Sequence, residues 1–178
     1  GAGKVLLDHD ARRRAAAPDP TPDTAAPLVL AHMQVLPGWI DYNGHMTESR
    51  YLFASSETCD AFLRHVGAGM EYVAAGFSYY TAESHILHAG EAKLGDRLTG
   101  SVQVLAADEK RLHLFIRIER GSDLVASIEQ MLLHVDMKAG KACPAKSEVL
   151  QRLMPIAEAH GALLRPGSAG RHVGQRKA

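Results

Sequence analysis

The sequence predicts an α+β domain in which a long central helix is wrapped by a five-stranded antiparallel sheet. Apolar residues recur with a period of two along several segments of the second half of the chain, which is typical of strands with two unlike faces. One earlier segment instead carries apolar residues at three- and four-residue spacing, which is typical of a helix with one buried stripe. A single sheet curled around that helix is the economical way to bury the stripe.

The long helix is expected over residues 48–66, after a short opening strand over 30–36. Thr47 suits the N-cap position and Gly67 suits the position just after the helix. The apolar stripe consists of Tyr51, Leu52, Ser55, Cys59, Phe62, Leu63 and Val66. Because the stripe must face the core, we expect Cys59 to be a buried thiol and not a nucleophile.

Four strands are expected after the helix. They cover residues 77–91, 97–106, 112–119 and 124–137. The polar breaks at 108–109 and 121–123 have the length of hairpin turns, so the last three strands should form an antiparallel meander. A second helix is expected over about 146–160.

The length of 178 residues indicates one domain, which we place at 29–160. Residues 1–28 are expected to be a disordered tail or linker, because four of the eight prolines lie between Pro18 and Pro27. Residues 161–178 are expected to be a flexible tail. Apolar residues make up 46% of the chain and charged residues 22%, which is typical of a globular protein.

Composition also argues against several classes of function. Twenty basic and twenty acidic residues give no net charge, so no nucleic-acid partner is expected. No apolar run reaches the roughly 18 residues of a membrane span, so no membrane partner is expected. Cys59 and Cys143 fit neither a disulfide framework nor a zinc ribbon, which favours reduced thiols and a cytoplasmic location. His85 and His88 would point to opposite faces of a strand, so no metal site is expected.

The densest polar cluster lies between the opening strand and the long helix. Asp41, Asn43 and His45 alternate there just before a helix N-terminus, whose free N–H groups favour a developing oxyanion. Asp41 could act as base or nucleophile on an acyl carbon, with Asn43 orienting it and His45 as a neutral donor or base. The alternative is an ordinary polar loop in which Gly44 supplies a positive φ.

The run Asp41-Tyr42-Asn43-Gly44-His45-Met46, followed by Arg50-Tyr51-Leu52, resembles the signature of hot-dog-fold acyl thioesterases. The resemblance covers about residues 30–155 and implies the hot-dog fold. It also implies catalytic roles for Asp41, Asn43 and His45, and a further acidic residue of that family falls on Glu91. The alternative for Glu91 is a surface carboxylate at a strand end.

Four stretches resemble the betainyl-CoA thioesterases of bacterial carnitine breakdown: DYNGHMTESRYL, YYTAESHILHAGEAKLGD, DEKRLHLF and EQMLLHVD. This resemblance implies hydrolysis of betainyl-CoA to betaine and CoA, no cofactor, and a homodimer or dimer of dimers. The segment GAGKVLLDHDARRR resembles the junction to a preceding L-carnitine dehydrogenase, but no glycine-rich dinucleotide loop is present, so no NAD is expected. The alternatives are another short or medium acyl-CoA, an acyl-ACP, or a non-catalytic acyl-binding or oligomerisation module.

Aromatic residues are concentrated near the candidate site, because nine of the ten lie between residues 39 and 80. A trimethylammonium group donates no hydrogen bonds and is held by aromatic faces. We therefore expect substrate-binding residues among Trp39, Tyr42, Met46, Thr47, Tyr79, Tyr80 and Glu83. The alternative is that the aromatic side chains only pack the core.

Overall fold

The computed structural model describes residues 24–174, so most of the expected linker (1–28) and the last four residues of the expected tail (161–178) lie outside the described residues. The elements in chain order are β1 (Leu28–Gln34), the 3-10 helix η1 (Pro37–Trp39), α2 (Glu48–His65), α3 (Met70–Ala74), β2 (Phe77–His88), β3 (Arg97–Ala107), β4 (Arg111–Arg120), β5 (Asp123–Asp136), β6 (Lys141–Ala142) and α4 (Ser147–Gly161). The predicted strand, long helix, four strands and final helix are all confirmed. The short η1, α3 and β6 were not predicted.

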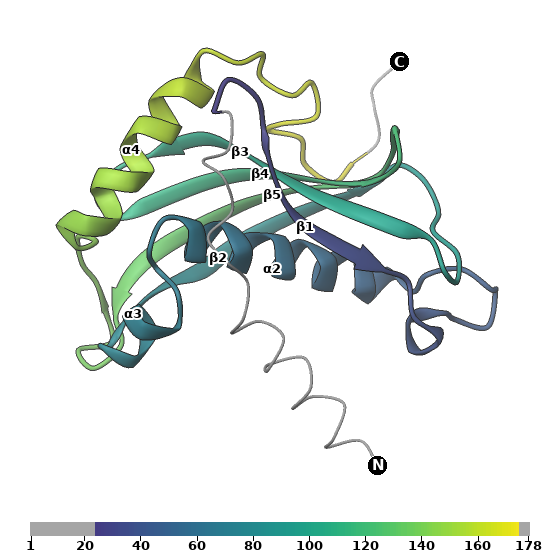
Figure 1. The fold of residues 1–178 in the computed structure, drawn as a ribbon, viewed down its shortest axis with the longest axis horizontal. Helices are drawn as coiled ribbons and strands as arrows, with labels where there is room; N and C mark the ends of the chain where they lie inside the picture. The colour runs from purple at the N-terminus through teal and green to yellow at the C-terminus, as the bar shows by residue number, and fades with distance from the viewer. Residues whose placement is uncertain (1–23, 175–178) are drawn as a thin grey trace.

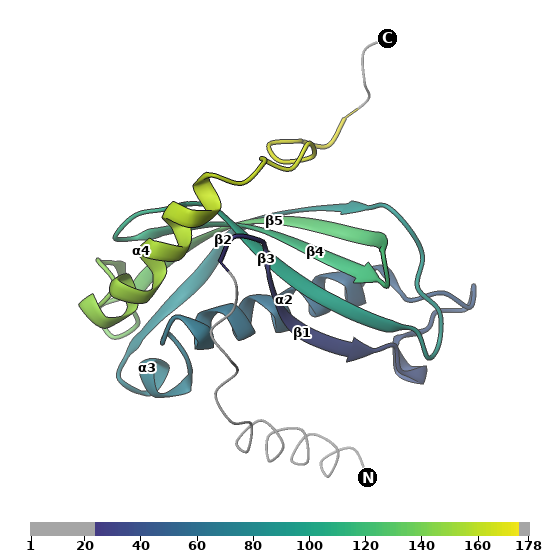
Figure 2. The same ribbon diagram turned by 45° about the horizontal axis from the view of Figure 1, so that its top comes forward.

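The five long strands form one antiparallel sheet in the order β1-β3-β4-β5-β2, and β6 pairs with the far end of β5. The predicted meander of β3, β4 and β5 is confirmed. The sheet curls around α2, which lies along its inner side, while α4 and α3 lie near one end of the sheet (Figures 1 and 2). This is the hot-dog arrangement that the resemblance implies.

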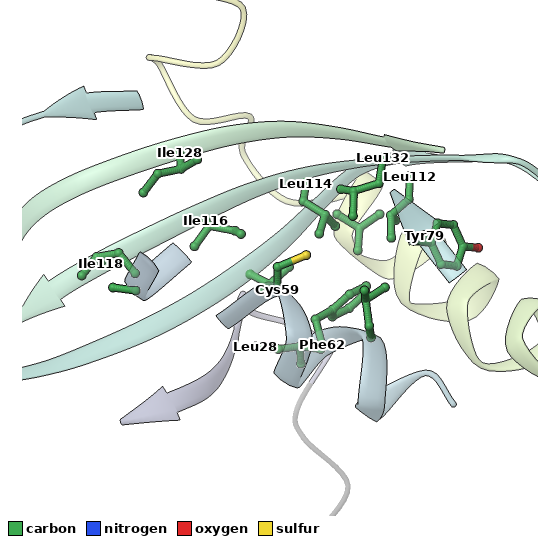
Figure 3. Close-up of a cluster of buried hydrophobic side chains, with 14 of the residues drawn as sticks. Leu28, Cys59, Phe62, Tyr79, Leu112, Leu114, Ile116, Ile118, Ile128 and Leu132 are labelled. Carbon is green, nitrogen blue, oxygen red and sulfur yellow. The ribbon is translucent and has the colours of Figure 1, made fainter. Parts of the chain in front are cut away.

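The core is formed where α2 packs on the inner face of the sheet. Cys59 and Phe62 point from the helix toward leucine and isoleucine side chains of β4 and β5 (Figure 3). Burying each large side chain of this kind contributes roughly 1.5–3 kcal/mol. Gly100 on β3 permits the close approach of the helix, because a Cβ there would clash with the Thr58 hydroxyl. The predicted burial of Cys59 is confirmed, since its exposed fraction is 5%.

Helix α4 protects the part of β3 that β1 does not reach. The pairing of β1 with β3 ends at Val102, which would leave the Val104 N–H at an open edge. His160 Nδ1 accepts a hydrogen bond from that N–H (2.9 Å), and Nε2 donates to Ala26 O (3.1 Å). Burial lowers the pKa of His160, which keeps the ring in the neutral form that this arrangement requires.

The segment after α4 crosses the outer face of the sheet (Figure 2). Gly170 N–H donates to Glu129 Oε2 (2.6 Å), and the Gln103 side chain donates to Leu164 O (3.3 Å).

Within the described part of the chain, no helix combines the length and hydrophobicity that crossing a membrane requires.

Candidate active site

The polar loop between η1 and α2 is a tight turn closed by its own backbone. Asp41 N–H donates to His45 O (2.9 Å), and Gly44 N–H donates to Asp41 O (3.1 Å). Gly44 has a φ of 79°, which lies in the left-handed region that glycine tolerates best. The turn therefore holds Asp41 and His45 side by side at the start of α2.

The Asp41 carboxylate serves the turn with one oxygen only. Its Oδ1 accepts hydrogen bonds from Asn43 N–H (2.8 Å) and His45 N–H (3.4 Å), as in an Asx turn. Its Oδ2 makes no hydrogen bond to any residue in 24–174 and is available to a substrate or a water. The turn therefore leaves one oxygen of this carboxylate free, and Asn43 contributes to its orientation through the backbone.

His45 and Glu91 form a pair across the two loops. Glu91 lies between β2 and β3, and its Oε2 is 3.1 Å from His45 Nε2. The pair is accessible, with side-chain exposed fractions of 34% for His45 and 67% for Glu91. An exposed pair of this kind adds little to stability. A carboxylate beside Nε2 favours a proton on that nitrogen and leaves Nδ1 as the basic atom of a neutral ring.

The first turn of α2, which follows the loop of Asp41 in the chain, offers free hydrogen-bond donors. The Thr47 N–H donates to Trp39 O (2.8 Å), and Thr47 occupies the predicted N-cap position, although its hydroxyl makes no capping hydrogen bond. The next two N–H groups, of Glu48 and Ser49, have no partner among the residues that the structure describes. They lie at the positive end of the helix dipole and can receive an oxyanion.

Three of the expected substrate-binding residues lie far from this loop within one chain. Tyr79, Tyr80 and Glu83 are on β2, whose last residue, His88, packs against Tyr51. Tyr80 precedes His88 by eight residues, which is roughly 26 Å along a strand. Glu83 and Tyr80 are exposed, whereas Tyr79 is buried with its ring edge-on to that of His134.

The aromatic residues beside Asp41 have different surroundings. Trp39 is 9% exposed, and its ring packs edge-on against Phe53. The Arg50 guanidinium lies 6.0 Å from the centre of the Trp39 ring and 5.7 Å from that of Phe53, so a cation of the chain itself already faces both rings. Tyr42 is 97% exposed, and Met46 is buried in the core.

Two residues of the site were not predicted from the sequence. The buried Tyr51 hydroxyl accepts a hydrogen bond from Ala92 N–H (3.1 Å), and Arg120 Nη1 donates to Glu91 O (3.0 Å). Tyr51 was assigned to the apolar stripe of the helix and to the thioesterase-like signature, but not to the site residues. The signal that could have singled it out is the hydroxyl, because a buried tyrosine usually has a hydrogen-bond partner.

A separate hollow lies beyond the other end of α2. It has a volume of about 600 Å³ and is lined by residues that include Arg64, Tyr72, Glu148 and Arg152. An 18-residue helix is about 27 Å long, so this hollow is remote from Asp41.

Within residues 24–174, no three His, Cys, Asp or Glu side chains lie close enough together to hold a metal ion.

Comparison with known proteins identifies the family. Residues 35–153 match the family model of the Thioesterase-like superfamily. A Rhizobium meliloti protein named L-carnitine dehydrogenase/betainyl-CoA thioesterase is 50% identical over 181 residues, which cover 99% of this chain and 36% of that protein. The chain thus spans about a third of the length of this relative. A betainyl-CoA thioesterase of Pseudomonas aeruginosa is 39% identical over 150 residues, which cover 83% of this chain and 94% of that protein.

Solved structures share the fold. A candidate thioesterase from Pseudomonas putida has a TM-score of 0.73 at 29% identity, with 85% of this chain and 99% of that chain covered. A Staphylococcus aureus protein in complex with CoA has a TM-score of 0.77 at 20% identity, with 84% and 97% covered, which supports the fold alone. The family model covers most of the folded part of this chain, and the Pseudomonas aeruginosa relative is matched over 94% of its own length. This chain therefore belongs to the thioesterase-like superfamily.

Proposed function

We propose that this chain hydrolyses betainyl-CoA to betaine and CoA. The observation that carries the hydrolase activity is the convergence of Asp41, His45 and Glu91, from two separate loops, at the open start of α2. The acyl group rests on relatives named for betainyl-CoA, which are 39–50% identical to this chain.

The geometry supports a route for thioester hydrolysis. The carbonyl oxygen of the thioester accepts hydrogen bonds from the N–H groups of Glu48 and Ser49, which stabilise the negative charge that develops on it. Asp41 Oδ2 either attacks the acyl carbon or takes a proton from a water that does so. The carbon–sulfur bond then breaks, and the proton released by the water passes through Nδ1 of His45, whose Nε2 is held by Glu91, to the leaving sulfur. Where Asp41 attacks directly, the water instead hydrolyses the acyl-Asp41 anhydride in a second step, which restores the carboxylate and supplies the same proton. The net reaction consumes one water and yields a carboxylic acid and a thiol.

The edge strand β2 supports a homodimer, which we include in the proposal. Residues 80–84 of β2 are all exposed, and one side of the strand pairs with β5 while the other is open. A long open edge is a template for pairing with a second strand. If two copies of β2 pair antiparallel about their midpoint, Tyr80 of one copy lies opposite His85 of the other. In this register Tyr80 of each copy lies closer along the strand to His88 of the other copy than to its own His88, whereas Glu83 lies opposite Ala82 near the two-fold axis.

The proposed dimer also offers a site for the trimethylammonium group. An exposed aromatic ring and a carboxylate, such as those of Tyr80 and Glu83, suit a cation that donates no hydrogen bonds. Trp39 is less suited, because Arg50 already faces its ring. We further propose that the chain acts in the cytoplasm together with, or fused to, an L-carnitine dehydrogenase, as the name of the Rhizobium meliloti relative suggests.

The test is a panel of thioesters read by release of free thiol. Betainyl-CoA should be hydrolysed with a higher kcat/KM than butyryl-, octanoyl- or benzoyl-CoA. A higher value for one of the others would make this chain a hydrolase of that acyl group. Binding of every thioester without turnover would instead indicate a non-catalytic acyl-binding module. Sedimentation of the same preparation tests the dimer, and a monomer at micromolar concentration would contradict it.

A further inference from the structure

We propose that Tyr51 is a positioning residue, which holds the Glu91 carboxylate against His45 by fixing the backbone on both sides of Glu91. The inference rests on the proposed function, because the position of Glu91 matters only if His45 takes part in hydrolysis. Tyr51 itself need not contact the substrate.

Glu91 needs support because little holds its side chain. It lies in the irregular segment between β2 and β3, and its side chain is 67% exposed. Ordering such a side chain loses rotamer entropy unless the backbone already presents it in the required place. The adjoining Ala92 provides a first anchor, since its carbonyl accepts a hydrogen bond from Met46 N–H (2.8 Å) and ties the two loops together.

The Tyr51 hydroxyl provides the second anchor, because it binds the backbone on both sides of Glu91. It accepts a hydrogen bond from Ala92 N–H (3.1 Å) and donates to Gly90 O (3.5 Å). The ring is held in place because it is 4% exposed and lies edge-on to the His88 ring, with 5.0 Å between centres. One hydroxyl therefore fixes the residue before Glu91 and the residue after it.

The protonation state of Tyr51 suits this double role. Burial, reinforced by the negative charges of Glu91 and Asp41, raises the pKa of Tyr51. The side chain therefore remains a phenol at neutral pH and keeps the proton that it donates to Gly90 O. Removing the hydroxyl would leave the Ala92 N–H without this partner, in a residue whose exposed fraction is 0%.

Arg120 supplies a third anchor from the end of β4. Its Nη1 donates to Glu91 O (3.0 Å) and lies 3.3 Å from Asp96 Oδ2, while its Nη2 lies 3.3 Å from Asp123 Oδ2. The two carboxylates fix the guanidinium, which in turn fixes the Glu91 carbonyl. Arg120 is itself accessible and is held by two surface ion pairs. We therefore expect the buried Tyr51 to contribute more than Arg120 to the position of Glu91.

Tyr72 is a matched control for Tyr51. It is also buried, at 8% exposure, and its hydroxyl also accepts a hydrogen bond from a backbone N–H, that of Lys146 (3.0 Å). Its other hydroxyl partner is His134 Nε2 (2.7 Å), so none of its hydrogen bonds reaches the segment around Glu91. Tyr51→Phe and Tyr72→Phe therefore remove the same chemical group from similar surroundings.

The experiment compares Tyr51→Phe, Tyr72→Phe, Glu91→Gln and the double variant Tyr51→Phe/Glu91→Gln on the best thioester of the panel. Tyr51→Phe should lower kcat at least fivefold with KM changed less than twofold, while Tyr72→Phe should keep kcat within twofold. In the Glu91→Gln background, Tyr51→Phe should change kcat less than twofold, because the carboxylate that Tyr51 positions is already absent. Wild-type kcat in Tyr51→Phe, or the same fold loss in both backgrounds, would overturn the proposal.

Amide hydrogen exchange tests the inference without any substrate. The Ala92 N–H should exchange at least tenfold faster in Tyr51→Phe than in the wild type, and at the wild-type rate in Tyr72→Phe. Unchanged exchange at Ala92 in Tyr51→Phe would overturn the proposal whatever the chain hydrolyses. Failure of the proposed function is a separate outcome, because it shows as no thioester turnover by the wild type.

Discussion

Two polar clusters lie at opposite ends of α2 and are built from similar residues, but the histidine is accessible in one and buried in the other. The open cluster, at the start of the helix, consists of Asp41, His45, Tyr51 and Glu91. The sealed cluster, beyond its end, consists of Tyr72, His134, Cys143 and Lys146. Each contains a tyrosine, a histidine and a backbone N–H bound by the tyrosine hydroxyl. The difference between them shows what separates a site from a structural clamp.

In the sealed cluster the hydrogen-bonding atoms of the histidine are all in use. His134 has an exposed fraction of 0%, its Nδ1 lies 2.8 Å from Cys143 O, and its Nε2 lies 2.7 Å from the Tyr72 hydroxyl. Since the carbonyl can only accept, Nδ1 carries the proton and Nε2 accepts from Tyr72. Cys143 Sγ, at 3.4 Å from Nδ1, therefore faces a nitrogen that cannot take its proton. This cluster ties β5, α3 and the start of α4 together.

In the open cluster several atoms remain uncommitted. Asp41 Oδ2 and the N–H groups of Glu48 and Ser49 have no partner in the part of the chain that the structure describes. The His45–Glu91 pair is accessible. Chemistry on a substrate needs such free acceptors and donors, whereas a clamp needs none. Under the proposed function, the same residue types serve catalysis or stability according to which of their atoms the fold leaves free.

Asp41→Asn should produce the largest effect, on activity alone. Losing a base or nucleophile should lower kcat about a thousandfold, which corresponds to about 4 kcal/mol of transition-state stabilisation. The amide keeps an oxygen for the Asx turn, so the free energy of unfolding should change by less than about 1 kcal/mol. Steady-state kinetics and denaturant unfolding measure the two quantities.

Asp136→Asn is the matched control for this variant. Asp136 Oδ1 also closes a turn, by accepting hydrogen bonds from Lys138 N–H and Ala139 N–H at 2.9 Å. It lies at the end of β5, so this variant should keep kcat within twofold. If Asp41→Asn retained more than a tenth of wild-type activity, Asp41 could not be the base or nucleophile.

His134→Ala and His45→Ala should show opposite losses. His134→Ala leaves a buried cavity and a Tyr72 hydroxyl without its partner, so it should lower the free energy of unfolding by about 2–4 kcal/mol. The folded fraction should keep kcat within about threefold. His45→Ala should lower kcat at least tenfold and the free energy of unfolding by less than about 1 kcal/mol. Comparable stability losses in both variants would erase the distinction between the clusters.

The sequence predicted the long elements well because each has a clear periodicity. The boundaries of α2 were marked by Thr47 and Gly67, and the structure ends the helix at His65. The elements that were missed have two to five residues, which is too short to show a period. The pairing of β2 with β5 was also not predictable, because hairpin lengths report only neighbouring strands and β2 pairs with a strand much later in the chain.

For the site, the sequence could identify only what a local motif carries. Asp41 and His45 lie in one loop and were identified from it, whereas Glu91 came from family resemblance. The roles of Tyr51 and Arg120 depend on hydrogen bonds to a backbone 29–41 positions away, which leave no local pattern. Likewise, nothing in the sequence showed that Arg50 would face the Trp39 ring.

A neutral substrate analogue should show a smaller effect and tests the acyl pocket. A tert-butyl group in place of the trimethylammonium keeps the shape and removes the charge. The wild type should hydrolyse this analogue with a kcat/KM about tenfold lower, which corresponds to about 1.4 kcal/mol. Tyr80→Leu should remove most of the preference and spare the neutral substrate, because leucine keeps apolar volume without an aromatic face. Equal efficiency on both substrates in the wild type would contradict an aromatic site for the cation.

The smallest expected effect is a pH dependence of stability that the two buried histidines produce. Burial lowers the pKa of both His134 and His160. The unfolded chain, with a histidine pKa of about 6.5, therefore binds protons at a pH where the folded chain does not. The stability is fully present above about pH 6.5 and is lost as the pH falls through the lowered pKa values.

Thermal unfolding between pH 7.5 and pH 5.0 measures this effect. The Tm of the wild type should fall as the pH falls, and the fall should be smaller in His134→Gln and in His160→Gln, because neither variant can take up that proton. An unchanged slope in both His134→Gln and His160→Gln would contradict the assignment of this pH dependence to the two buried histidines.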